Sequence, residues 1–145
     1  MRRSVFVFLS VLVGAAVLAG PDLASSTAAP TITVRDSTYG WILFAGSNRV
    51  LYVFTHDPRG KATCYGECAR RWPPYVVHGA VRAGAGGRRS LLGTIRRRDG
   101  SRQLTYVGRP LYFYIGDAPG QVRCQNVREF GGLWLVVRAS GRLVR

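Results

Sequence analysis

The sequence predicts a small all-β domain made of two tandem repeats of the β-hairpin type, arranged as a sandwich or in a barrel-like way. Three observations lead to this prediction. Short runs rich in β-branched and aromatic residues alternate with turn sequences, no stretch shows a sustained period of 3.6 residues, and one segment recurs at an offset of 60 residues. A length of 145 residues suits a single domain, and no long helix is expected in the mature chain.

The N-terminus carries the pattern of a secretory signal peptide. Two arginines precede an apolar run over residues 4–20, and small residues follow. We predict a signal peptide at 1–29, cleaved at about 24–29, and a secreted protein without a later transmembrane span. The alternative is an uncleaved segment that retains the protein at the membrane, although the run is short for a spanning helix. Pro21 rather than Cys follows the run, so no lipid attachment site is expected there.

Residues 30–145 are expected to form the β domain, with repeat halves at about 31–85 and 86–145. The turn residues 46–48 and the Asp99-Gly100 dipeptide each mark the turn of a hairpin. A further strand and a final strand pair follow. The expected strands are 41–44, 50–54, 91–95, 103–107, 111–114, 133–137 and 143–144.

The repeated segment has the pattern Tyr-x-aromatic-x-x-Asp. Alternation along a strand places the Tyr and the second aromatic residue on one face, and the Asp opens a turn that contains Pro and Gly. One interpretation is structural, with core aromatics and a turn-closing carboxylate. The other is a binding site in which rings stack on a ligand and carboxylates bind hydroxyls or a cation, or act as an acid–base pair. The candidate residues are Tyr52, Phe54, Asp57, Tyr112, Tyr114 and Asp117.

Together with the residues between and after the two motifs, this pattern resembles a bacterial secreted-repeat family of unknown function, described as predicted lipoproteins with a Yx(FWY)xxD motif. The resemblance covers about residues 39–138 and implies an exported envelope protein with a tandem β-type repeat. Two features depart from the family: the lipid-attachment Cys is missing, and Cys124 stands where Gly, Asn or Thr is expected. The additional matching residues are Cys64, Cys68, Trp72, Pro73, Pro74 and the segment 131–134.

The three cysteines favour one short disulfide. An exported protein meets an oxidising compartment, so Cys64 and Cys68 are expected to pair, although a bond from either one to Cys124 stays open. Under the favoured pairing Cys124 is a free thiol or joins two chains in a dimer. A redox or metal-handling role for the Cys64/Cys68 loop with His56 is an alternative function.

The chain is strongly basic, with 21 basic and 7 acidic residues and a formal net charge of +14. Arginine supplies all basic residues except Lys61, so base composition is one explanation and attraction to a polyanion is the other. Anionic cell-envelope polymers or lipid head groups are the expected partners, and nucleic acid is not expected for an exported protein. The densest cluster is Arg88, Arg89, Arg96, Arg97, Arg98 and Arg102.

Sequence motifs of hydrolases, zinc proteases and phosphate-binding loops do not occur in the chain. We therefore expect no catalytic residues, no metal ligands and no cofactor. The sequence fits an exported, non-catalytic envelope or extracellular protein that acts as a binding or interaction module. A polyanion binder that uses the Arg-rich segment is a second alternative.

Overall fold

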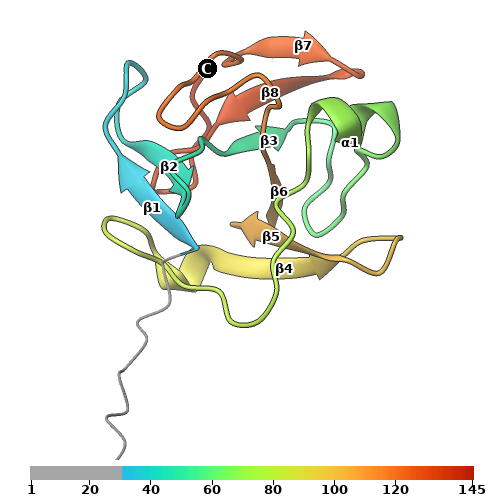
Figure 1. Ribbon diagram of the computed structural model, residues 1–145, viewed down its shortest axis with the longest axis horizontal. Coiled ribbons are helices and arrows are strands. Elements are labelled where there is room, and N and C mark those ends of the chain that lie inside the picture. The colour runs from blue at the N-terminus through green and yellow to red at the C-terminus, as the bar shows by residue number, and fades with distance from the viewer. Residues whose placement is uncertain (1–30) are drawn as a thin grey trace, which may run out of the picture.

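The structure, a computed structural model, describes residues 31–145, so the predicted signal peptide at 1–29 lies outside the described residues (Figure 1). Its regular elements are almost all strands, which confirms the prediction of a small all-β domain. They form a two-stranded sheet and a six-stranded sheet with the order β4-β5-β6-β3-β8-β7. The strands are β1 (Ile32–Arg35), β2 (Ile42–Ala45), β3 (Tyr52–Phe54), β4 (Leu92–Arg96), β5 (Arg102–Tyr106), β6 (Arg109–Tyr112), β7 (Val127–Glu129) and β8 (Gly132–Val136).

The first two strands of each half form an antiparallel pair, and the two pairs start 60 residues apart in the sequence. β1 pairs with β2 and β4 pairs with β5, both antiparallel. The expected hairpin around Asp99-Gly100 is the β4–β5 pair. Around residues 46–48 the chain forms a short hairpin with a bridge between Phe44 and Val50, and the Ala45 and Leu51 amides donate to the Arg49 and Leu43 carbonyls. On its other edge β2 pairs along its length with β1, which was not among the expected strands.

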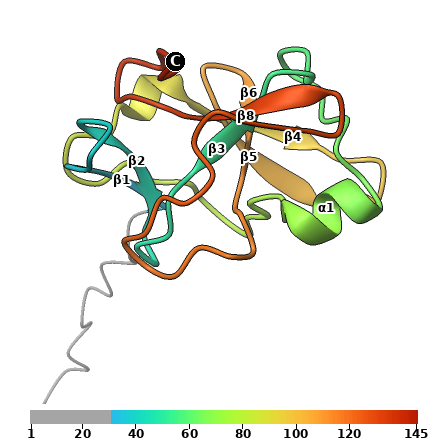
Figure 2. The same cartoon turned by 90° about the horizontal axis from the view of Figure 1, so that it is seen from above.

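Two further elements were not expected from the sequence. A short helix, α1 (Glu67–Arg71), follows the first cysteine, and β7 pairs with β8 through three residues. A 3-10 turn at Arg89–Leu91 precedes β4. Seen from above, β1 and β2 lie at one end of the molecule and α1 at the other (Figure 2).

The two halves interlock at the centre of the larger sheet. β3 of the first half lies beside β6 of the second, with Tyr52 opposite Tyr112. On its other side β3 pairs with β8, which belongs to the second half. β6 in turn contacts the chain after Trp72, through a bridge between Pro74 and Tyr112. β3 therefore lies between two strands of the second half, whereas β6 lies between β5 of its own half and β3 of the first half. Neither half completes the larger sheet alone.

The aromatic core crosses the boundary between the halves. The buried rings of Trp72 and Trp134 stack with centroids 4.0 Å apart and planes 4° apart. Phe54 stacks on Trp134 at 4.3 Å, and Tyr114 lies 4.8 Å from Trp72. Burial of such large rings supplies much of the stabilisation of a small domain.

Candidate functional site

The repeated motif forms two crossed hydrogen bonds inside the core. The Tyr52 hydroxyl donates to Asp117 Oδ2 at 2.8 Å, and the Tyr112 hydroxyl donates to Asp57 Oδ2 at 2.6 Å. The tyrosine of each half thus binds the aspartate of the other half. Burial and the neighbouring carboxylate raise the pKa of both tyrosines, so both hydroxyls stay protonated and donate.

The other oxygen of each aspartate holds the loop that follows it. Asp57 Oδ1 accepts hydrogen bonds from the Thr63 amide at 2.8 Å and the Thr63 hydroxyl at 2.6 Å. Asp117 Oδ1 accepts one from the Arg123 amide at 3.0 Å. Burial raises the pKa of Asp117, while the hydrogen bonds from Tyr52 and Arg123 oppose that effect. The four polar motif groups are bonded to one another and to these loops; a ligand-binding role for the motif stays a prediction.

Two cavities of nearly equal size lie beside these loops and correspond to each other at the offset of 60 residues. We call the first the basic pocket; its volume is about 450 Å³ and its lining residues are Gly60, Lys61, Ala62, Thr63, Tyr65, Arg96 and Arg98. We call the second the counterpart pocket; its volume is about 460 Å³ and its lining residues are Asp36, Ser37, Thr38, Gly120, Gln121, Val122 and Arg123.

The two pockets have the same construction and different charge. In both pockets one wall is a loop that follows the motif aspartate, residues 60–63 in the first half and 120–123 in the second. The other wall comes from the C-terminal end of β4 or from the residues just after β1. The loops are held alike, because Gly60 donates to the Gly108 carbonyl and Gly120 to the Asn48 carbonyl, both at 2.7 Å. The basic pocket is lined by three cations and no carboxylate, whereas Arg123 and Asp36 of the counterpart pocket have opposite charges.

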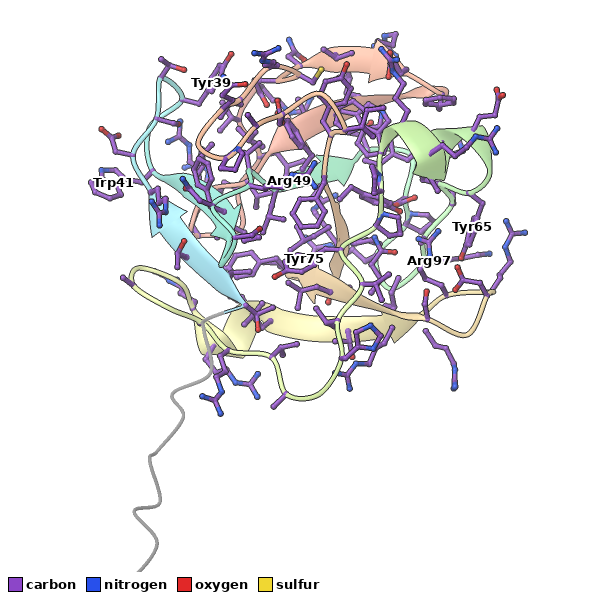
Figure 3. The ribbon with its side chains drawn as sticks, in the orientation of Figure 1. Tyr39, Trp41, Arg49, Tyr65, Tyr75 and Arg97 are labelled. Atoms are coloured by element: carbon purple, nitrogen blue, oxygen red, sulfur yellow. A yellow bond between two sulfur atoms is a disulfide. The ribbon has the colours of Figure 1, made fainter. Side chains whose placement is uncertain are left out.

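Tyr65 and Arg97 fasten the rim of the basic pocket to the disulfide loop, and Figure 3 shows them side by side between α1 and the β4–β5 turn. The guanidinium carbons of Arg97 and Arg98 lie 4.3 Å and 4.0 Å from the centre of the Tyr65 ring. Arg97 donates to the Cys64 carbonyl at 2.8 Å and to Gln103 Oε1 at 2.6 Å. The cation–π contacts and hydrogen bonds give the pocket a fixed edge.

The structure separates the Arg-rich cluster into surface and interior residues. Arg96 and Arg98 line the same pocket. Arg88, Arg89 and Arg102 are exposed. Arg97 is only 4% exposed and acts as a buried anchor.

Sequence reasoning missed Lys61 and Tyr65 as pocket residues, because both come from the half opposite to the Arg-rich segment. The alignment of residues 60–63 with 120–123 was a signal that could have led to Lys61.

The cysteines follow the favoured pairing. Cys64 and Cys68 form a disulfide with a Cα–Cα distance of 5.2 Å, which confirms that prediction. Cys124 is half-buried and has no disulfide partner among the described residues. It lies 60 residues after Cys64, an equivalence that the repeat alignment could have shown. A dimer through Cys124 stays a prediction.

Residues 31–145 contain no group of three His, Cys, Asp or Glu side chains placed to hold a metal ion. In the same part of the chain, no helix has the length and apolar character needed to cross a membrane.

A family model described as a secreted repeat of unknown function matches residues 93–138. The matched segment runs from β4 past the end of β8 and so covers the second copy of the motif together with Trp134. Over residues 93–138 this match confirms the resemblance to the secreted-repeat family, and the family's secreted character agrees with an exported protein of unknown function. Searches of curated proteins and of solved structures find no match.

Proposed function

We propose that the protein is an exported, non-catalytic binding module whose basic pocket holds the phosphate groups of an anionic cell-envelope polymer. The observation that carries this proposal is the difference between two pockets of the same construction. Base composition acts on both halves of one gene, so it does not explain why Lys61, Arg96 and Arg98 stand where the counterpart pocket has Gln121, Asp36 and Thr38.

The chemistry of the lining supports an anionic ligand. Lys61, Arg96 and Arg98 are exposed, so their charges are free to contact a ligand. A guanidinium presents a planar fork of donors that matches phosphate oxygens, and Lys binds phosphate as a compact charge. Like charges gathered around one cavity repel one another, and a bound anion relieves that repulsion.

The Tyr–Asp pairs support the site indirectly. The pair of Tyr112 and Asp57 holds Thr63, which lines the basic pocket. In this proposal the motif shapes the pocket, and the cations on its rim bind the ligand.

The test exchanges residues between the pockets. The double variant Lys61→Gln and Arg98→Thr places the counterpart residues at two of these three positions, where the same fold already accepts them in its other half. We expect it to weaken binding to immobilised phosphate-bearing wall polymer by about tenfold or more, since each cation near a dense anionic charge contributes about 1 kcal/mol. Binding is measured as the retained fraction at increasing salt, where phosphate contacts weaken steeply.

The matched control is Arg128→Ala with Arg142→Ala, which removes the same charge from exposed positions outside both pockets. Equal losses in the two double variants would show general attraction to a basic protein and would contradict the proposal. Binding of the unchanged protein to anionic lipid vesicles but not to wall polymer would also contradict it, because the partner would then be a membrane surface.

A further inference from the structure

The basic pocket is one end of a longer row of cavities. A second cavity of about 240 Å³ shares Arg96 with the basic pocket, and a third of about 240 Å³ shares Thr94 and Arg102 with the second. The row follows β4 and ends beside Arg89, which lines the third cavity. We call these three adjoining cavities the basic track.

The track is lined by cations along its whole length. Its five charged lining residues are Lys61, Arg89, Arg96, Arg98 and Arg102. No Asp or Glu lines any of the three cavities. Asp99 lies in the β4–β5 turn, and its carboxylate accepts hydrogen bonds from the Ser101 amide at 2.9 Å and the Ser101 hydroxyl at 2.6 Å. It also forms an ion pair with Arg97 at 3.7 Å.

One pair in the track is unfavourable in the free protein. Arg96 and Arg102 face each other across the β4–β5 ladder, and like charges directly opposite in a sheet are destabilising. At the equivalent positions of the first half, Asp36 is next to the end of β1 and Ile42 begins β2, so no such repulsion exists there. The Arg102 guanidinium also donates to the Gly79 carbonyl, and an anion that contacts both arginines would offset their repulsion.

We infer that the basic track binds an extended, linear phosphate polymer, with consecutive phosphate groups placed along β4, rather than one compact anion. This inference rests on the proposed function and specifies its ligand. β4 has five residues and spans roughly 16 Å, whereas one phosphate reaches donors only about 3 Å from its oxygens. A single phosphate therefore contacts the cations around one point of the track, and a chain is needed to reach all five cations.

The experiment compares inorganic tripolyphosphate with long-chain inorganic polyphosphate by calorimetry on the purified protein, with affinities expressed per phosphate. We expect the long chain to bind at least tenfold more tightly. Its logarithmic salt dependence should have a slope of about −3 to −4, because each of five contacts contributes about 0.7.

The variant Arg89→Ala tests the far end of the track. It should weaken long-chain binding about fivefold and leave tripolyphosphate binding unchanged, because Arg89 lines only the third cavity. Arg142→Ala, which removes an equal charge away from the track, should change neither affinity.

Three results would overturn the inference and leave the proposed function in place: equal affinities per phosphate for the short and long chains, equal effects of Arg89→Ala and Arg142→Ala, or equally tight binding of polyglutamate of matched charge. Failure of both phosphate compounds to bind would instead contradict the proposed function itself.

Discussion

The interior of the molecule repeats between the two halves, and its rim does not. Inside, Tyr52 and Tyr112 donate to aspartates of the opposite half, and Trp72 and Trp134 stack on each other. Outside, one pocket is cationic and its counterpart carries charges of both signs. The core fixes residues by packing and by hydrogen bonding, whereas the rim is exposed to water and its residues can differ at little cost to stability. A charge difference at equivalent rim positions therefore points to function more directly than the total charge does.

The largest loss of stability is expected from removing one of the two stacked tryptophans, which occupy corresponding places in the two halves. Trp72→Ala and Trp134→Ala should each lower the free energy of unfolding by about 3–5 kcal/mol. Trp72 should cost more, because its Nε1 donates to Glu129 at 2.8 Å, whereas Nε1 of Trp134 is buried without a partner among the described residues. Urea unfolding followed by circular dichroism measures both values.

The double tryptophan variant checks that the halves share one core. Its cost should be smaller than the sum of the single costs, because removing either ring already ends the stacking contact. Strictly additive costs would mean that the two rings stabilise their halves independently.

The crossed hydrogen bonds should differ in strength although they look alike. Tyr112→Phe leaves Asp57 with two donors from Thr63, while Tyr52→Phe leaves Asp117 with only the Arg123 amide. Since a buried acceptor that loses a donor costs about 1–3 kcal/mol, we expect Tyr52→Phe to be the more destabilising change. Equal denaturant midpoints and slopes for the two variants would contradict this ranking.

The Cys64–Cys68 disulfide stabilises the first half, and the second half has no equivalent bond among the described residues. Removal of the disulfide should therefore make the two halves more alike in their covalent structure. The double variant Cys64→Ser and Cys68→Ser should lose at most about 2 kcal/mol, because the closed loop is short. Cys124→Ser should change stability by less than about 0.5 kcal/mol. Thermal unfolding under non-reducing conditions measures both. A larger loss of stability for Cys124→Ser than for the double variant would contradict the prediction that Cys64 and Cys68, and not Cys124, form the disulfide.

The smallest expected effect is a pH dependence confined to Asp117. Burial raises its folded-state pKa above the ordinary value of 3.8, so the folded protein holds this proton more tightly than the unfolded chain does. The favourable contribution is complete below the unfolded pKa and is lost as the pH rises through the folded pKa. Asp117→Asn should lack this decline. Urea unfolding of both proteins across the mildly acidic range measures it, and parallel pH profiles would show that the burial has no energetic consequence.

The sequence predicted the features that depend on local pattern. The β4–β5 hairpin follows from β-branched residues on either side of Asp99-Gly100, and the Cys64–Cys68 bond follows from close spacing. Long-range partners were not predictable in this way. The Tyr52–Asp117 bond joins residues 65 positions apart, and no periodicity encodes which aspartate a tyrosine meets. The helix α1 has five residues, too few to produce a helical pattern.

The interlocked strands bear on when this protein can fold. β3 needs β8, so the central sheet is incomplete until Val136 is available to pair. Contacts between such distant segments form slowly, because a long loop must close before they contribute stability. A chain synthesised from its N-terminus thus has no finished core until nearly its whole length is available to pair. The second half, which the secreted-repeat family model matches, thus supplies strands without which the first half has no complete sheet.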